Sequence, residues 1–330
     1  MQPRHLHGSN ITLVLLAVGG GDPELRAARR LVEHLAGSSS RPLDVHLATS
    51  GSRHPAAPAS WRQHMLESLP AAARALHERY ANLTHGPGSI YMYKPLLHHL
   101  LPPSIDRALV LDTDLYLPSR AYDLAGLWDE FEAFPPEAAL GLALEQQPTY
   151  EHLGGGFNGG VQLLHLARMR THRGLYEREL ERCATGACGV IGYLGDQTFY
   201  SEVRKATPSL FHALPCGWNL QLSTQFWNHP HFMALSSCED HCRMVHGNEP
   251  IFKRVLARLQ SVDGGRRRAT CEECEVALAS EGTNARSASS GFTHMSRKLL
   301  NCCCHDASSK ERQRRNRARF NSLLPDWFNL

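Results

Sequence analysis

No stretch of the sequence is long and apolar enough to cross a membrane as a helix, which takes about 18 residues. The longest early apolar run covers only residues 11–18. Three glycines, Gly19 to Gly21, follow it in place of the small-residue cleavage site that a signal peptide needs. We therefore interpret this run as a buried strand and the glycines as the turn after it.

The chain also lacks a strong excess of either charge, because 35 Lys and Arg face 32 Asp and Glu. With 42% hydrophobic and 20% charged residues it is typical of globular proteins, which excludes global disorder, collagen and coiled coils. The basic residues are concentrated in 264–319. We interpret the basic run 310–319 as a solvated tail, with binding of nucleic acid or acidic glycans as the alternative, and we do not expect nucleic acid as a partner.

Cysteine is absent from the first 182 residues, and ten cysteines follow. An even number at short spacings favours disulfides in an oxidising compartment. The triplets that begin at Asn10 and Asn82 are glycosylation acceptors if the chain enters the secretory route. For the last cysteines a zinc site remains the alternative, formed by Cys271 and Cys274 with residues 302–305.

Hydrophobic periodicity predicts alternating strands and helices, which indicates an α/β fold with a mostly parallel sheet. The predicted strands and extended segments are 11–18, 43–48, 108–117, 138–144, 157–164, 211–222 and 243–246. The predicted helices are 25–35, 61–80 with an interruption at Pro70, 91–101, 122–134, 167–182, 196–205 and 249–262. The composition then changes, and 264–268 and 279–290 are typical of a linker or of disorder. We expect one catalytic domain, 1–262, and a Cys-containing, basic, partly disordered extension, 263–330.

The sharpest motif is Asp112-Thr113-Asp114, directly after the apolar residues 108–111. Ligands bind beyond the carboxyl ends of strands in open α/β sheets. Two carboxylates two residues apart can face the same side, and burying them without a cation is costly. A divalent ion would offset that cost and could also hold a diphosphate, whereas a turn with solvated acids is the simpler alternative.

Three further segments carry polar groups next to predicted strands or helices. The glycine-rich run 154–160 contains Asn158 and permits close approach of a ligand, although a flexible hairpin loop would look the same. Asp196-Gln197 begins a predicted helix, where an aspartate is also an ordinary N-cap residue. His246 ends a short strand and is a possible ligand for Mn²⁺ or Zn²⁺.

Together these motifs resemble glycosyltransferase family 8. The resemblance covers about residues 11–262. Its motifs occur in the family's order: YMYK at 91–94, LLP at 100–102, VLDTD at 110–114, FNGGV at 157–161, GDQ at 195–197 and HG at 246–247. The segment LPCGWNLQL at 214–222, together with 106–117, is similar in particular to the xylosyltransferase domain of the LARGE-type glycosyltransferases.

The resemblance implies a GT-A (Rossmann-like) fold, a UDP-sugar donor, Mn²⁺ and retention of the anomeric configuration. Asp112, Asp114 and His246 would hold the metal, and Asp196 and Gln197 would act at the sugar near its anomeric carbon. Other residues would bind the donor. Ala17 and Val18 would contact the uridine, Asn158, Gly159 and Gly160 would line the sugar site, and Gly247, Asn248 and Lys253 would contact the diphosphate. Lys94, Leu111 and Thr113 would also contact the donor.

Two positions depart from the family's pattern. Lys253 stands one residue farther from His246 than the family's usual lysine, and the Asn-Gly-Gly at 158–160 replaces the usual Asn-Ala-Gly or Asn-Ser-Gly, a change that would enlarge the sugar pocket. Gln197 is an amide and a poor nucleophile, so we expect front-face attack by the acceptor hydroxyl. Asp196 would orient the sugar and stabilise positive charge.

The predicted activity is sugar transfer to a glycan or glycoprotein hydroxyl, with xylose as the first candidate and glucose or galactose as the second. A catalytically inactive glycan- or protein-binding module on the same fold is the alternative. A second alternative assigns the function to the tail, as a zinc or nucleic-acid module. We expect acceptor contacts from the loops 145–156 and 223–237.

We also expect a Golgi or secretory-lumen location, with membrane association only through an anchor outside this chain. Disulfides suit such an enzyme better than zinc. The expected pairs are Cys183–Cys188 and Cys216 with either Cys238 or Cys242.

Overall fold

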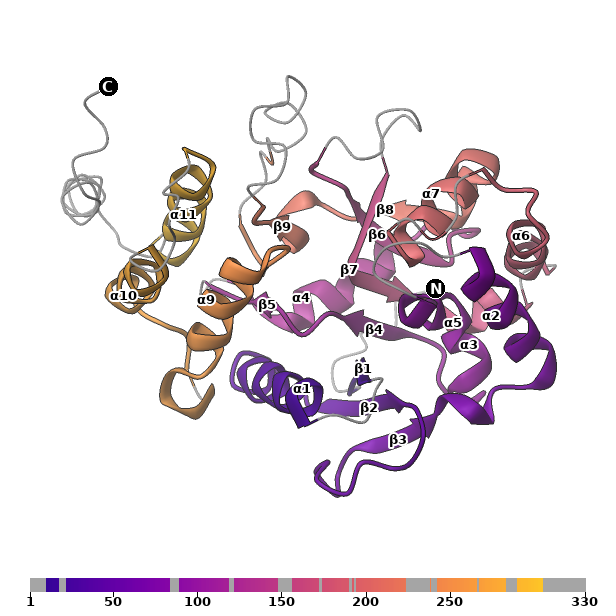
Figure 1. The fold of residues 1–330 in the computed structure, drawn as a ribbon, viewed down its shortest axis with the longest axis horizontal. Helices are drawn as coiled ribbons and strands as arrows, with labels where there is room; N and C mark the ends of the chain where they lie inside the picture. The colour runs from indigo at the N-terminus through magenta and orange to yellow at the C-terminus, as the bar shows by residue number, and fades with distance from the viewer. Residues whose placement is uncertain are drawn as a thin grey trace, which may run out of the picture.

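The fold was analysed in a computed structural model of the chain. It describes residues 10–17, 22–83, 89–118, 122–147, 156–171, 174–189, 192, 194–223, 238, 242–265, 267–282 and 290–304. A central sheet lies between two layers of helices, and the C-terminal helices pack at one end of it (Figure 1). No helix in these ranges is both long and apolar enough to span a bilayer.

The central sheet has seven strands in the order β3-β2-β1-β4-β7-β6-β8. Their bounds are β1 Ile11–Ala17, β2 Leu43–Thr49, β3 Arg62–Met65, β4 Ala108–Leu111, β6 Leu140–Leu144, β7 Phe157–Leu164 and β8 Phe211–Ala213. Neighbouring strands are parallel except that β7 runs antiparallel to both β4 and β6. The predicted mostly parallel α/β sheet is therefore confirmed.

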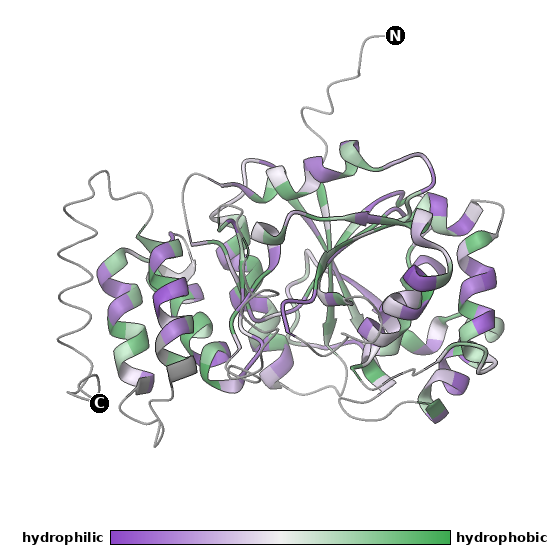
Figure 2. Cartoon of the chain, turned by 90° about the horizontal axis from the view of Figure 1, so that it is seen from above, coloured by the Kyte–Doolittle hydropathy of each residue, from purple (hydrophilic) through white to green (hydrophobic). Residues whose placement is uncertain are grey.

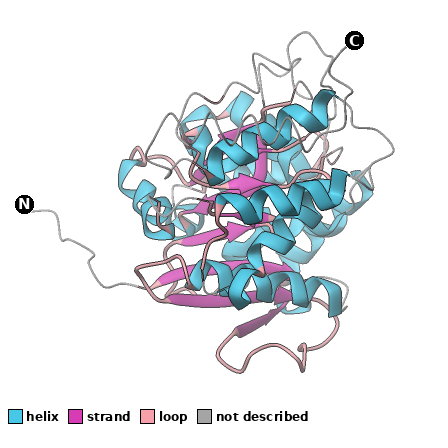
Figure 3. Cartoon of the chain, turned by 90° about the vertical axis from the view of Figure 1, so that its left-hand side faces the viewer, coloured by secondary structure: helices cyan, strands magenta, loops and turns pink. Residues whose placement is uncertain are grey.

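The central strands are apolar because both of their faces are covered. In β1, Leu13 and Leu15 face one hydrophobic cluster and Val14 faces the other, as the two-residue period of a strand requires. Figure 3 shows the strands stacked between helices on both sides, and Figure 2 shows that the sheet is largely hydrophobic. Continuous apolar strands of this kind are typical of parallel sheets.

The helices divide between the two faces. The first face is covered mainly by α1 (Asp22–Ala36) and α4 (Leu124–Asp129). The second is covered by α2 (Ala71–Leu83), the 3-10 segment η2 (Ser89–Leu96), α3 (Leu97–Leu100), α5 (Leu166–Thr171), α6 (Leu175–Ala184) and α7 (Asp196–Ala206). The shorter 3-10 segments are η1 (Leu66–Ser68), η3 (Glu130–Ala133), η5 (Pro208–Leu210), η6 (Cys216–Asn219) and η7 (Val262–Gly265).

A second, three-stranded sheet in the order β5-β10-β9 extends the first beyond β4. It consists of β5 (Leu115–Tyr116), β9 (Leu220–Gln221) and β10 (Val245–His246). The single strand predicted at 108–117 is therefore wrong in one respect: the turn Asp112-Thr113-Asp114 divides it into β4 and β5. The predicted helix at 61–80 is also wrong in its first part, which forms the edge strand β3 and η1.

The C-terminal region forms helices where the composition predicted a linker or disorder. Helix α9 (Pro250–Gln260) packs against α10 (Cys271–Gly282), which in turn contacts α11 (Ser290–Cys303). The three helices share a third hydrophobic cluster that includes Phe252, Leu278 and Leu299. The expectation of a linker or disorder at 279–290 is thus wrong for residues 279–282, which end α10, and the basic run 310–319 lies outside the described residues.

All ten cysteines form disulfides. The expected pairs Cys183–Cys188 and Cys216–Cys238 are confirmed. The remaining bridges are Cys242–Cys302, Cys271–Cys304 and Cys274–Cys303. Because disulfide sulfurs are not thiolate ligands, the zinc alternative for these cysteines is wrong. The Cys242–Cys302 bridge ties the C-terminal helices to the segment before β10.

Candidate active site

The candidate site lies where β4 ends and β7 begins. Since β7 is antiparallel to β4, its first residues lie at the carboxyl end of β4. The Asp112 amide donates to the Gly160 carbonyl over 2.9 Å, which extends this pairing into the acidic turn. On the other side, the Gly247 amide donates to the Asp114 carbonyl over 2.9 Å. Backbone hydrogen bonds therefore fix the acidic turn from both of its neighbours.

The three predicted metal ligands come together in this frame. Asp112, Asp114 and His246 each offer one ligand atom, and these atoms lie within 4.8 Å of one another. His246 Nε2 lies 3.3 Å from Asp114 Oδ1 and 3.8 Å from Asp112 Oδ2. Two carboxylate oxygens and an imidazole nitrogen that face a common point form a donor set for a divalent metal.

The tautomer of His246 is set by two asparagines. Its Nδ1 lies 3.1 Å from Oδ1 of Asn158 and 3.1 Å from Oδ1 of Asn219. The identity of the Asn158 oxygen follows from its other contacts, because it accepts from the Gly160 amide and from Asn219 Nδ2. His246 Nδ1 therefore carries a proton, and Nε2 faces the two aspartates, the orientation that a metal ligand requires.

Glu145 is a further member of this network. Its Oε2 accepts from Asn158 Nδ2 over 3.0 Å, and its side chain is buried. Burial raises the pKa of this carboxyl, although the hydrogen bond from Asn158 opposes the shift. The contact holds the amide of Asn158 in the orientation that presents its oxygen to His246. Neither Glu145 nor Asn219 was predicted from the sequence as a site residue.

Lys94 brings a positive charge to the other side of the acidic turn. Its ammonium donates to Asp112 Oδ1 over 2.8 Å and to the Gly159 carbonyl over 2.8 Å, and it lies 3.8 Å from Asp196 Oδ2. Burial alone would lower the pKa of Lys94, but the two carboxylates outweigh it and raise that pKa above its usual value. Lys94 is therefore charged at all physiological pH values.

Asp114 remains ionised although it is nearly buried. Burial would raise its pKa, but His246 and Lys253 lower it below the usual range. Lys253 Nζ lies 3.1 Å from Asp114 Oδ2, and the pKa values of His246 and Lys253 are raised by the same carboxylate despite burial. Asp114 thus faces His246 with one oxygen and Lys253 with the other. A divalent cation could replace the proton between His246 Nε2 and these ionised carboxylates.

Asp196 begins α7 but is not its N-cap, since Gly195 takes that position with a φ of 62°. The Asp196 carboxyl is buried and accepts from Gln162 Nε2 over 2.6 Å. Burial and the charge of Asp112 raise its pKa to about 6, against the opposing effect of Lys94. Asp196 is therefore a carboxyl that titrates close to neutral pH, and Gln197 follows it, half-buried.

An open cavity borders the acidic turn. Of the predicted residues it is lined by Lys94, Leu111, Asp112, Thr113, Asp114 and Lys253. Four lining residues were not predicted: Leu16, Glu24, Ile90 and Tyr91. Tyr91 belongs to the YMYK motif, so the motif itself could have indicated it. Leu16 immediately precedes the predicted Ala17, which is buried.

The other predicted residues lie behind this cavity or outside the described residues. Asn158, Gly159 and Gly160 are buried in β7. The space that a Cβ on Gly159 would take holds the carboxylate of Asp196, and the space at Gly160 holds the ring of His246. The enlargement of the sugar pocket by the glycine at 159 stays a prediction. Gly247 packs against the backbone of Lys253, and the Asn248 amide donates to the His246 carbonyl. Val18, as well as most of the two predicted acceptor loops, lies outside the described residues.

Comparison with known sequences places these features in context. No protein-family model matches the chain. Human xyloside xylosyltransferase 1 is 34% identical over 192 residues, which cover 50% of this chain and 48% of the human protein. The chicken xylosyl- and glucuronyltransferase LARGE2s is 28% identical over 247 residues, which cover 68% of this chain and 32% of the chicken protein. The chain spans about half or less of the length of these relatives.

Comparison with solved structures also finds a xyloside xylosyltransferase. Apo mouse xyloside xylosyltransferase 1 superimposes with a TM-score of 0.59 at 26% identity, covering 73% of this chain and 98% of that one. The galactosyltransferase LgtC, solved with donor and acceptor sugar analogues, superimposes with a TM-score of 0.51 at 13% identity over 86% of this chain and 100% of its own, which supports the GT-A fold. The chain is thus a relative of the xyloside xylosyltransferases and the LARGE-type enzymes, as its resemblance to glycosyltransferase family 8 predicted.

Proposed function

We propose that this protein is a retaining, Mn²⁺-dependent glycosyltransferase that moves a sugar from a UDP-sugar to a hydroxyl group of a glycan or glycoprotein. The observation that carries the proposal is the convergence of Asp112, Asp114 and Nε2 of His246, with both aspartates lining an open cavity. Xylose is the first candidate for the sugar, since the relatives are named as xylosyltransferases. Glucose and galactose are the second candidates.

The proposed cation fits the donor set of this site. Mn²⁺ accepts carboxylate oxygen and imidazole nitrogen, and when bound it would supply Lewis-acid stabilisation of the negative charge on a departing diphosphate. Asp112, Asp114 and His246 would hold it. Three carboxylates, Asp112, Asp114 and Asp196, share two lysines here, so a divalent cation would offset the remaining negative charge.

The chain's own cations would assist the departure of the UDP group. Lys94 is permanently charged and preorganised by Asp112 and the Gly159 carbonyl, so it would stabilise developing negative charge without rearranging. The Lys253 ammonium lines the cavity beside Asp114 and would contact the diphosphate. This position supports a phosphate-binding role for Lys253 despite its altered spacing from His246.

Asp196 and Gln197 would act at the sugar. Gln197 carries an amide, which is a poor nucleophile, so we propose front-face attack by the acceptor hydroxyl. The ionised form of Asp196 would orient the sugar and stabilise the positive charge that develops at its anomeric carbon. The hydrogen bond from Gln162 holds the carboxylate in place for this role.

We further propose that residues 1–262 form the catalytic domain and that 263–330 is an extension docked on α9. All residues of the described cavity fall in the first segment. The five disulfides support a location in the secretory lumen, because such bonds persist in oxidising compartments.

The test is release of UDP from a panel of UDP-sugars, with Mn²⁺ and with EDTA, because slow donor hydrolysis needs no acceptor. We expect release from one sugar, UDP-xylose first, and its loss in EDTA and in Asp114→Asn. Asp44→Asn serves as the control, since Asp44 pairs with Arg62 at the far edge of the sheet. Binding of UDP-sugar without release in folded protein would instead support the inactive binding module.

A further inference from the structure

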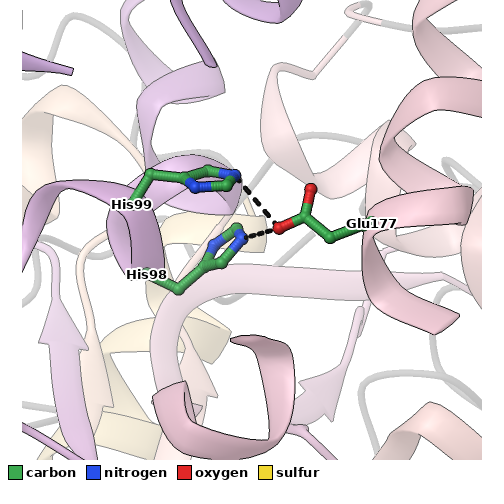
Figure 4. A group of neighbouring side chains, drawn as sticks. All are labelled: His98, His99 and Glu177. Atoms are coloured by element: carbon green, nitrogen blue, oxygen red, sulfur yellow. Dashed lines mark hydrogen bonds and ion pairs between the residues drawn. The ribbon is translucent and has the colours of Figure 1, made fainter. Parts of the chain in front are cut away.

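A second cluster of ligand-bearing side chains lies outside the transferase site, between α3 and α6. His98 and His99 are adjacent on α3, and Glu177 is on α6. Both histidines direct Nε2 at the same carboxylate oxygen, as Figure 4 shows: Glu177 Oε1 lies 2.7 Å from His98 Nε2 and 3.1 Å from His99 Nε2. The three ligand atoms lie within 4.8 Å of one another.

The two histidines are not equivalent in this cluster. His98 makes a hydrogen bond to Glu177, whereas His99 Nε2, although buried, has no hydrogen-bond partner among the described residues. His99 Nε2 instead forms a 3.1 Å ion-pair contact with the oxygen that His98 also contacts, so one carboxylate oxygen faces two imidazole nitrogens, an arrangement that a bound cation would suit. In tetrahedral zinc sites neighbouring ligand atoms lie roughly 3.3 Å apart, so a shift of a few tenths of an ångström would admit an ion.

We propose that His98, His99 and Glu177 form a zinc site, separate from the metal site of the transferase. Two imidazole nitrogens and one carboxylate oxygen suit Zn²⁺, whereas harder cations such as Mn²⁺ and Mg²⁺ prefer mostly oxygen ligands. The side chain of His98 is fully buried, but those of His99 and Glu177 are 25% and 35% exposed. Solvent therefore reaches one side of the site, where water would complete the coordination.

The surrounding charges permit this occupant. Arg170 is a cation close to these histidines, and its guanidinium donates to the carbonyls of His98, Leu101 and Ile105. It is therefore engaged with the C-terminal end of α3 and does not compete for Glu177.

A zinc ion here would strengthen the connection that Glu177 already makes between α6 and the two histidines of α3. His98 already contacts the ring of Tyr176 edge-on, with centroids 5.2 Å apart. The segment η2, which carries Lys94, leads directly into α3. We therefore expect the ion to stabilise the position of α3 against α6, and with it the backbone that supports Lys94.

The experiment is a zinc measurement in a background where the transferase site cannot bind metal. Oxidised Asp112→Asn/Asp114→Asn protein is stripped with EDTA, loaded with Zn²⁺ and dialysed, and its zinc content is measured by mass spectrometry. We expect one equivalent, with a Kd in the micromolar range or below from chelator competition. Co²⁺ in its place should give the intense visible absorption of a tetrahedral site.

Adding His99→Ala or Glu177→Gln to this background should weaken zinc binding at least tenfold. His212→Ala is the matched control, because His212 faces Glu130 at 3.9 Å without a second histidine, and it should leave zinc binding unchanged. Circular dichroism in EDTA verifies that each variant is folded, and Glu177→Gln removes the ligand without removing bulk.

Absence of stoichiometric zinc in the background variant, or zinc binding that is unchanged by His99→Ala and by Glu177→Gln, would refute the proposal. Neither result depends on donor hydrolysis, so the proposed transferase activity is tested separately.

Discussion

Gly160→Ala is a one-carbon change that should disable the proposed metal site without altering any proposed ligand. A Cβ at residue 160 would lie 2.1 Å from Cε1, 2.5 Å from Nδ1 and 2.8 Å from Nε2 of His246. Ordinary contacts between carbon atoms are about 3.5 to 4.0 Å long, so the ring would have to move by well over 1 Å. The backbone of Gly160 is in a strand and accommodates alanine, so the clash is the whole effect.

The consequences can be followed along the contacts of His246. Its two Nδ1 hydrogen bonds are 3.1 Å long, and a shift of this size would break both. Each is worth about 1 kcal/mol, and overpacking adds about 1 to 3 kcal/mol, so we expect a less stable but folded protein. Loss of the orienting bonds alone typically weakens metal binding about 10- to 100-fold, and displacement of the ligand should exceed that.

The assay is a Mn²⁺ titration of wild type and Gly160→Ala, followed by electron paramagnetic resonance of the free ion. Donor hydrolysis at saturating Mn²⁺ gives a second readout. Gly189→Ala is the control, because its Cβ would meet only the carboxyl end of the Glu202 side chain, at 3.2 Å, and that side chain can move. Wild-type affinity for Mn²⁺ in folded Gly160→Ala would show that His246 is not a ligand.

Three further predictions follow from the same contacts. Asp112→Asn should abolish Mn²⁺-dependent donor hydrolysis while the circular dichroism spectrum stays unchanged, and near-normal turnover would remove Asp112 from the metal site. Because the folded pKa of Asp196 is raised to about 6, its carboxylate is lost as the pH falls through 6, so donor hydrolysis should decline there with an acidic limb; Asp196→Asn should be slow at every pH and lack that limb, and an unchanged limb would assign it to another group. Cys242→Ser/Cys302→Ser opens a bridge with a sequence separation of 60 and should lower the free energy of unfolding by about 2 to 4 kcal/mol in a denaturant titration; equal stability would mean that the C-terminal helices are held by packing alone.

The central strands could be predicted because each is a run of apolar residues buried on both faces. Strands β1, β2 and β7 end within one residue of the predicted positions. The edge strand β3 could not, since its sequence Arg62-Gln63-His64-Met65 has no apolar pattern, and its extended form depends on pairing with β2. Strand preference in such segments is set by their neighbours in the sheet.

The C-terminal helices show a similar limit. Their composition is polar and rich in glycine and serine at the ends, so periodicity does not distinguish them from a linker. Burial of Leu278 and Leu299 against α9, together with the Cys242–Cys302 bridge, supplies the stabilisation that local sequence does not. Such contacts join residues far apart in the chain, and no local pattern records them.

In the candidate site, resemblance supplied the metal ligands and Lys94, whereas the residues that orient them are visible only in the fold. Asn219 contacts His246 directly and also holds Asn158, Glu145 holds Asn158, and Gln162 holds Asp196, each across many residues of sequence. A buried polar side chain in a strand gives no sign of which distant group it bonds. The structure therefore adds the residues that orient the proposed metal ligands and Asp196.

The paired glycines of β7 explain why the site needs an antiparallel strand at this place. Successive residues of a strand point to opposite faces, so Gly159 and Gly160 leave space on different sides. The space at Gly159 holds the carboxylate of Asp196, and the space at Gly160 holds the ring of His246. Because β7 runs against β4, both spaces open beside Asp112 rather than at the far end of the sheet. Residues 157–160 of the glycine-rich run are thus the start of a strand, and this strand brings the proposed metal ligands and Asp196 together.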